Sequence, residues 1–113
     1  MKVLIVKPGE EPYEEDIKHS LERMQEIVGG PIQAVYPYAD PVAIVCNDEG
    51  KLEGLPLNRV LKDKQGKVYD VIVGTFFIAG LSDDNFTDLP PELKKKYKEK
   101  FKYPEKFILR RNA

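Results

Sequence analysis

The chain has 113 residues, of which 42% are hydrophobic and 33% are charged, and its formal net charge at pH 7 is −1. This length and composition suit one globular domain with a single core. No apolar run approaches the roughly 20 residues that a membrane-spanning helix needs. The near-zero charge excludes a whole-molecule attraction to nucleic acid or to a membrane surface, so any electrostatic recognition must use local patches.

The N-terminal run Val3–Val6 is wholly apolar and rich in β-branched residues, a pattern typical of a strand covered on both faces. It is too short for the apolar region of a signal peptide, so we expect a cytoplasmic protein. The single cysteine, Cys46, excludes an intrachain disulfide. Because Cys46 lies in the apolar run Val42–Cys46, we interpret it as a core residue.

A first helix is predicted from Tyr13 to Val28, because apolar residues recur there at spacings of three and four. The acidic cluster Glu14–Asp16 suits the positive end of the helix dipole, and Gly29-Gly30 supplies a left-handed stop. The only histidine, His19, lies away from the apolar stripe and is expected to be exposed. The apolar positions of the stripe are Ile17, Leu21, Met24, Ile27 and Val28.

Two pairs of β-prone runs predict antiparallel pairing. Ile32–Tyr36 and Val42–Cys46 are joined by a segment with two prolines, which favours a fixed connection over a tight turn. Leu57–Leu61 and Val68–Val73 are separated by a short glycine-containing loop, which favours a hairpin. Phe76–Ile78 is expected to complete the core.

A second helix is predicted from Asp88 to about Phe101, with the Asp88 side chain as cap and prolines in the first turn. Its apolar residues fall four apart and should pack on the sheet, whereas its lysines are interpreted as solvated. Beyond this helix, Phe107–Leu109 is expected to add an edge strand. The apolar seam consists of Leu89, Leu93, Tyr97 and Phe101.

These elements predict one α+β domain over residues 1–113, with a mainly antiparallel sheet of about five strands covered by two helices. No motif in the sequence indicates catalysis, a metal site or a cofactor. One histidine and one cysteine cannot supply a zinc site of the usual spacing, and Gly29-Gly30 follows a helix where a phosphate-binding loop precedes one. We therefore expect a non-enzymatic protein, with an unrecognised enzyme as an alternative.

Asn58 and Arg59 form a polar pair inside the otherwise apolar stretch Leu55–Leu61. Strand alternation cannot place both polar side chains on one face and all the apolar ones on the other, so at least one must meet the interior, a groove or an edge. In one explanation Arg59 pairs with a carboxylate such as Asp70, while Asn58 bonds to backbone in a turn. In the other, the guanidinium and the amide recognise a phosphate or carboxylate of a ligand.

The second explanation defines a candidate site for a small anionic, nucleotide-like ligand. Thr75 would join it from the neighbouring strand. Tyr36, Tyr38 and Phe76 are the aromatic residues that would stack on a planar group of the ligand. Aromatic residues of a small sheet are also typical of the core, so both interpretations stay open. The candidate site residues are Asn58, Arg59, Thr75, Tyr36 and Phe76.

Two other kinds of partner are considered. A host protein could dock on the acidic first helix, which carries Glu14, Glu15 and Glu22. Nucleic acid could bind the lysine-rich second helix and Arg110-Arg111, but this is less favoured because acidic segments cancel the basic charge overall.

Three segments resemble a bacterial and phage family catalogued as domain of unknown function 3846: Met1–Val6, Gly54–Arg59 and Gly74–Gly80. The run Pro56-Leu57-Asn58-Arg59 matches the most recognisable signature of that family, and the resemblance covers nearly all of the chain. It implies an accessory protein of a mobile element or phage, and it implies no catalytic residue.

Overall fold

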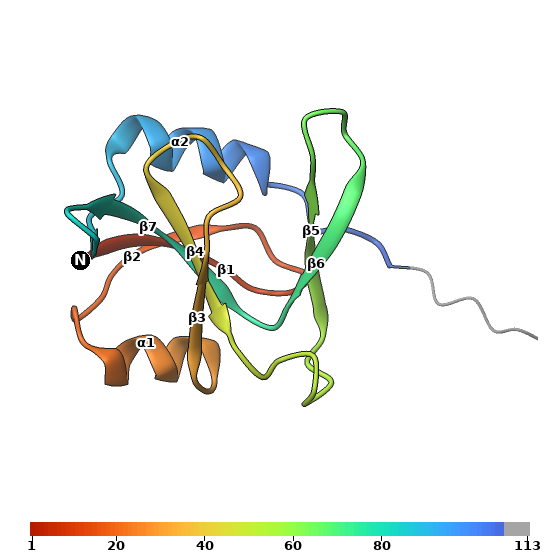
Figure 1. The fold of residues 1–113 in the computed structure, drawn as a ribbon, viewed down its shortest axis with the longest axis horizontal. Coiled ribbons are helices and arrows are strands. Elements are labelled where there is room, and N and C mark those ends of the chain that lie inside the picture. Colours follow the sequence, from red (N-terminus) through yellow and green to blue (C-terminus); the bar gives the residue numbers. More distant parts are fainter. Residues whose placement is uncertain (108–113) are drawn as a thin grey trace, which may run out of the picture.

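The computed structural model describes residues 1–107, and within them the chain forms two antiparallel sheets and two helices (Figure 1). The main sheet contains β1 (Lys2–Val6), β2 (Tyr13–Asp16), β3 (Ile32–Val35), β4 (Val42–Asn47), β7 (Phe76–Ser82) and β8 (Asn85–Thr87). Its strand order is β2-β1-β7-β4-β3, and β8 pairs with β7. A separate sheet consists of β5 (Leu57–Lys62) and β6 (Val68–Val73).

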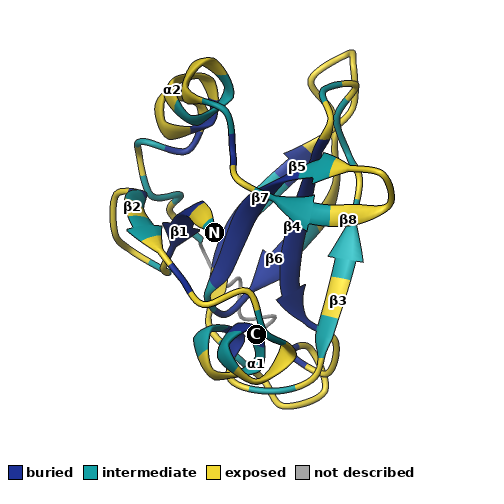
Figure 2. Cartoon of the chain, turned by 90° about the vertical axis from the view of Figure 1, so that its left-hand side faces the viewer, coloured by how far each residue is buried: buried dark blue, intermediate teal, exposed yellow. Residues whose placement is uncertain are grey.

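Two apolar clusters cover the two faces of the central strands, which are the most deeply buried part of the molecule (Figure 2). Along β1 the side chains alternate, so Leu4 and Val6 belong to one cluster while Val3 and Ile5 belong to the other. This two-sided burial explains the uninterrupted apolar runs of β1, β4 and β7, and it confirms that the first strand is central. Cys46 is buried as predicted.

Helix α1 (Leu21–Val28) packs on one face of the main sheet, through the buried Met24 and Val28. The helix predicted from Tyr13 is wrong in its first half, because Tyr13–Asp16 forms β2 and pairs with β1. The Ser20 side chain accepts a hydrogen bond from the backbone of Arg23 and caps the true helix start. The predicted glycine stop is confirmed, since Gly29 adopts φ 80°.

Helix α2 (Pro91–Lys100) lies on the opposite face (Figure 1), and its predicted apolar seam is confirmed. Leu89, Tyr97 and Phe101 are buried and Leu93 is half-buried. The predicted cap is wrong: Asp88 instead accepts a hydrogen bond from the backbone of Lys2 at 2.7 Å. The predicted strand at 107–109 lies outside the described residues apart from its first residue, which is not in a strand.

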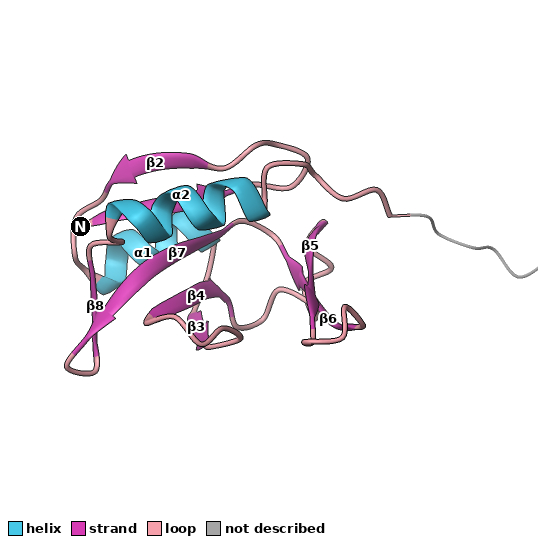
Figure 3. Ribbon diagram, turned by 90° about the horizontal axis from the view of Figure 1, so that it is seen from above, coloured by secondary structure: helices cyan, strands magenta, loops and turns pink. Residues whose placement is uncertain are grey.

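The β5–β6 hairpin lies at the end of the main sheet away from β8 (Figure 3). Both predicted antiparallel pairs, β3 with β4 and β5 with β6, are confirmed, as is the α+β class. The difference from prediction is that the strands divide between two sheets. Within residues 1–107, neither helix is long and apolar enough to cross a membrane.

Candidate functional site

Asn58 and Arg59 are buried side by side at the start of β5, each with only 1% of its surface exposed. Between Leu57 and Arg59 the β5–β6 register shifts, so that β5 carries one more residue than β6 at this point. A bulge of this kind interrupts strand alternation, which explains how two adjacent polar residues both come to be buried.

The side chain of Asn58 bonds to backbone from two other parts of the chain. Its Nδ2 donates to the carbonyl of Val6 at 3.0 Å and to the carbonyl of Gly74 at 2.8 Å. Its Oδ1 accepts from Nη1 of Arg59 at 2.8 Å. The expected bonding of Asn58 to backbone is therefore confirmed, but it joins β5 to β1 and to the segment before β7 and forms no local turn.

The guanidinium of Arg59 is held by carbonyl oxygens. Its Nη2 donates to the carbonyls of Glu10 at 2.6 Å and Phe101 at 2.8 Å, and Nε donates to the same Phe101 carbonyl at 3.3 Å. The suggested pairing with Asp70 is wrong, because that carboxylate bonds to Lys51 at 2.6 Å. Burial lowers the pKa of Arg59, and the nearby Glu105 carboxylate opposes this effect.

The other predicted site residues do not converge on one cavity with Asn58 and Arg59. Thr75 is half-buried between β6 and β7, and Tyr36 is 61% exposed just beyond the end of β3. Phe76 is fully buried and packs edge-to-face on Phe101, with 5.7 Å between the ring centroids. Phe76 is thus a core residue in this structure, and Asn58 and Arg59 attach the hairpin to the rest of the fold.

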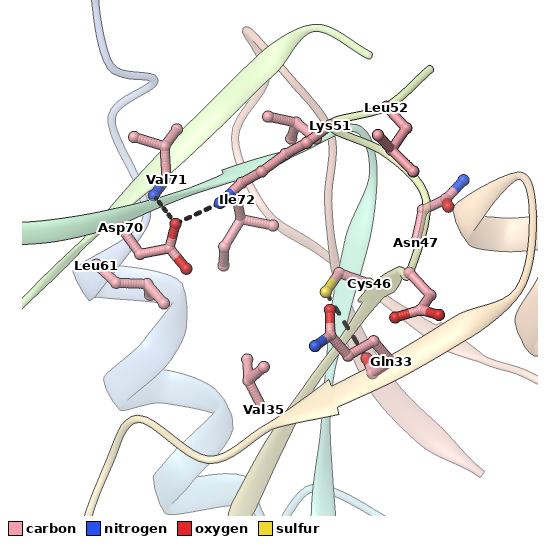
Figure 4. A pocket seen from close by; sticks show the side chains of 12 residues that line it. Gln33, Val35, Cys46, Asn47, Lys51, Leu52, Leu61, Asp70, Val71 and Ile72 are labelled. Atoms are coloured by element: carbon pink, nitrogen blue, oxygen red, sulfur yellow. Dashed lines mark hydrogen bonds and ion pairs between the residues drawn. The ribbon is translucent and has the colours of Figure 1, made fainter. Parts of the chain in front are cut away.

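A cavity of about 210 Å³ lies between the ends of β3 and β4 and the β5–β6 hairpin (Figure 4). Its wall includes Cys46, whose thiol lies 3.7 Å from the carbonyl of Gln33. Burial raises the pKa of this thiol, which keeps it protonated and weakens it as a nucleophile. The side-chain ions Lys51 and Asp70 pair with each other, and Lys51 lowers the pKa of Asp70.

A larger cavity of about 430 Å³ lies between α2, the segment after β3 and the tip of the hairpin. We call it the tyrosine–lysine cleft, because three tyrosines and four lysines line it. Its lining residues are Pro37, Tyr38, Ala39, Asp40, Lys62, Asp63, Lys64, Tyr69, Lys96, Tyr97 and Lys100. Lys62, Lys64 and Tyr69 come from the hairpin, whereas the last three come from α2.

Aromatic rings and ammonium groups lie close together in the cleft. The rings of Tyr38 and Tyr97 are 5.0 Å apart, and Nζ of Lys100 lies 5.0 Å from the Tyr38 ring centroid. Asp40 accepts hydrogen bonds from Lys96 at 2.6 Å and from the Tyr97 hydroxyl at 2.7 Å, and these bonds lower its pKa. Burial raises the pKa of both tyrosines, so their hydroxyls remain donors at neutral pH.

The carboxylates in the cleft already accept hydrogen bonds from the protein, whereas three of its four lysines form no salt bridge within residues 1–107. Asp40 binds Lys96, and Asp63 accepts hydrogen bonds from the backbone of its own turn. Among residues 1–107, the ammonium groups of Lys62, Lys64 and Lys100 form no salt bridge. The cleft therefore offers cations for an anion and tyrosine faces for a planar group.

Of the residues in this cleft, the sequence indicates Tyr38 as a candidate stacking wall, and it favours solvated lysines on α2. One signal was present in the sequence: Lys96 and Lys100 are four apart and therefore share a helix face. Their approach to Lys62, Lys64 and Tyr69 depends on how the hairpin is attached to the fold, and no local pattern encodes that.

The acidic cluster expected on the first helix lies instead on the edge strand β2. Each carboxylate there has a cation of the same chain nearby: Glu14 lies 3.8 Å from Lys94, Glu15 lies 3.5 Å from Arg23, and Asp16 lies 2.9 Å from the N-terminal amine. Of the three glutamates expected on the acidic helix, Glu14 and Glu15 therefore lie on β2, and only Glu22 lies on α1. In the described part of the chain, no group of three or more His, Cys, Asp or Glu side chains is arranged to hold a metal ion.

The model of a family described as a domain of unknown function (DUF3846) matches residues 1–102, which include the Asn58–Arg59 pair and every residue lining the tyrosine–lysine cleft. No curated protein and no solved structure is significantly similar to this chain. Because the family model covers most of its length, the chain belongs to the DUF3846 family.

Proposed function

We propose that this protein binds a small anionic ligand with a planar group, such as a nucleotide, in the tyrosine–lysine cleft. In this proposal it acts by binding, as an accessory protein of a mobile element or phage. The observation that carries the proposal is that Lys62, Lys64 and Lys100 line one cavity together with Tyr38 and Tyr69. None of these lysines forms a salt bridge with a carboxylate of residues 1–107, and Lys100 lies over the Tyr38 ring.

The size and chemistry of the cleft support this ligand class. A volume of about 430 Å³ lies within the range of roughly 300–1,000 Å³ typical of small-molecule sites. Lysines act as point charges for phosphate oxygens, and tyrosine rings stack on bases. The cavity beside Cys46 supports it less well, because it is about half this volume and its Lys51 ammonium already binds Asp70.

The Asn58–Arg59 pair has an indirect part in this proposal. By bonding to Val6, Gly74 and Phe101, the two side chains fix the base of the hairpin against β1 and the end of α2. The hairpin then carries its lysines and Tyr69 to the cleft. Asn58 and Arg59, which the sequence suggests as ligand contacts, thus attach the hairpin, and the hairpin supplies the proposed ligand contacts.

Calorimetric titration with ADP, adenosine and pyrophosphate tests the proposal. We expect ADP to bind more tightly than either fragment, because it satisfies the lysines and the ring faces together. Lys100→Gln should weaken ADP binding about fivefold to tenfold, the effect of losing roughly 1 kcal/mol of ion pairing. Lys18→Gln is the matched control, since Lys18 is exposed and lines none of the cavities described above.

Unchanged ADP affinity in Lys100→Gln, or equal weakening by Lys18→Gln, would contradict the assigned location. No detectable binding of any of the three compounds to the wild-type protein would remove support for the ligand class.

A further inference from the structure

A second, smaller cavity shares two lining residues with the tyrosine–lysine cleft. Lys62 and Lys100 also line a neighbouring cavity of about 110 Å³, together with Arg59, Tyr103 and Glu105. The two cavities therefore adjoin through these two lysines. We call the combined depression the α2–β5 groove, because α2 and β5 supply the lysines at its centre.

Each part of this groove carries an exposed aromatic ring. Tyr69 lines the larger cavity and is 56% exposed, and Tyr103 lines the smaller one and is 76% exposed. Nζ of Lys102 lies 5.5 Å from the Tyr103 ring centroid, which adds a cation beside that ring. Large exposed rings are suited to stacking on planar partners, and the shared Lys62 and Lys100 belong to both parts of the groove.

The charges of the groove favour an anion along its whole length. The guanidinium of Arg59 donates its hydrogen bonds to carbonyls of the protein, so it adds positive potential without contacting the ligand. The exposed lysines would contact the ligand directly. Three carboxylates also line the groove, and each is engaged by the protein. Asp40 binds Lys96, Asp63 bonds to backbone of its own turn, and Glu105 accepts a hydrogen bond from the backbone of Val60.

We propose that the α2–β5 groove binds a short single-stranded nucleic acid, with one base on Tyr69, another on Tyr103 and the intervening phosphates beside Lys62 and Lys100. Alternating stacking faces and lysines along a groove are the features by which proteins hold single strands without reading their sequence. In a duplex each base face is covered by stacking on the neighbouring base pairs, so a duplex is not the expected ligand. The inference rests on the proposed function, because it makes the nucleotide cleft one part of a longer site.

Fluorescence anisotropy with labelled oligothymidylates tests this inference. Affinity should rise at least about tenfold from a mononucleotide to a tetranucleotide, because only the longer ligand reaches both tyrosines. Tyr103→Ala should weaken tetranucleotide binding at least about fivefold and leave mononucleotide binding unchanged. Two phosphate contacts should give a slope of about −1.4 for log affinity against log salt.

Tyr36→Ala is the matched control, since Tyr36 is similarly exposed but lines neither cavity of the groove. Tyr103 is exposed, so replacing it tests binding without removing core contacts. Equal affinity for one and four nucleotides, with no effect of Tyr103→Ala, would overturn the inference and leave the proposed function standing. Failure of mononucleotide and tetranucleotide alike would overturn both, and preference for a duplex would overturn the inference alone.

Discussion

Arg59 shows how a buried cation can be satisfied without a carboxylate. Its donors bond to the carbonyls of Glu10 and Phe101 and to the Asn58 side chain, so three parts of the chain depend on one guanidinium. A buried charge is destabilising unless hydrogen bonds replace the water that it loses. The planar guanidinium of Arg59 provides these hydrogen bonds in several directions, which the compact ammonium of a lysine does not.

Removing the Arg59 fork should therefore destabilise the fold. We expect Arg59→Ala to lower the free energy of unfolding by about 2–4 kcal/mol, because it leaves buried carbonyls unpaired and a cavity behind. Arg59→Lys should restore little of the loss, since one ammonium cannot reach oxygens on both sides of the fork. Urea unfolding monitored by circular dichroism measures both. A lysine variant as stable as the wild type would contradict this account of the guanidinium.

Asp40 supplies a pH-dependent contact at the same scale. Its bonds to Lys96 and Tyr97 hold its pKa below the ordinary value of 3.8, so the folded state binds the proton less readily than the unfolded chain. Stability from this contact is complete above pH 3.8 and is lost as pH falls through the lowered pKa. We expect Asp40→Asn to melt below the wild type at pH 7 and to match it in stronger acid. A difference in melting temperature that persists unchanged down to pH 2 would exclude this ion pair as the cause.

At the scale of elements, the local sequence pattern was sufficient to predict an element when the apolar residues of that element alone determine its structure. The strands β1 and β4, the burial of Phe76–Ile78 and the seam of α2 were predictable, because a continuous apolar run or a spacing of four leaves few alternatives. Tyr13–Asp16 was misassigned because Tyr13 and Ile17 are four apart, which suits a helix. The open edge of β1 takes these residues as a strand instead, and the spacing of apolar residues within 13–28 carries no information about that pairing.

The hairpin base gives a further prediction about elements. Gly74 adopts φ 72°, and a Cβ built on it lies 2.7 Å from Cδ1 of Leu55. Gly74→Ala should thus lose about 1–3 kcal/mol of stability from backbone strain and crowding together. Gly66 is the matched comparison: its φ is 81°, but a Cβ there meets no atom within 4 Å, so Gly66→Ala carries the strain alone. Thermal unfolding of the two variants should rank Gly74→Ala as the less stable. The reverse order would show that crowding at the hairpin base is unimportant.

At the scale of the whole molecule, a net charge of −1 conceals an uneven distribution. Carboxylates of β2 pair with cations of other elements, whereas Lys62, Lys64 and Lys100 gather beside tyrosines in the tyrosine–lysine cleft. Family membership and the α+β class followed from the sequence. The cleft did not, because its lining comes from three segments that are far apart in the chain, and the hairpin segment is held in position by the bonds of Asn58 and Arg59.

The central claim is that a nucleotide-like anion binds between α2 and the hairpin. Its most direct test is an NMR titration of uniformly ¹⁵N-labelled protein with ADP, followed through the backbone amide shifts. The account predicts that the largest shift changes fall at Tyr38, Lys64, Tyr69 and Lys100, which line the cleft. Changes confined to the surroundings of Cys46 and Lys51, or no changes at saturating ADP, would contradict it.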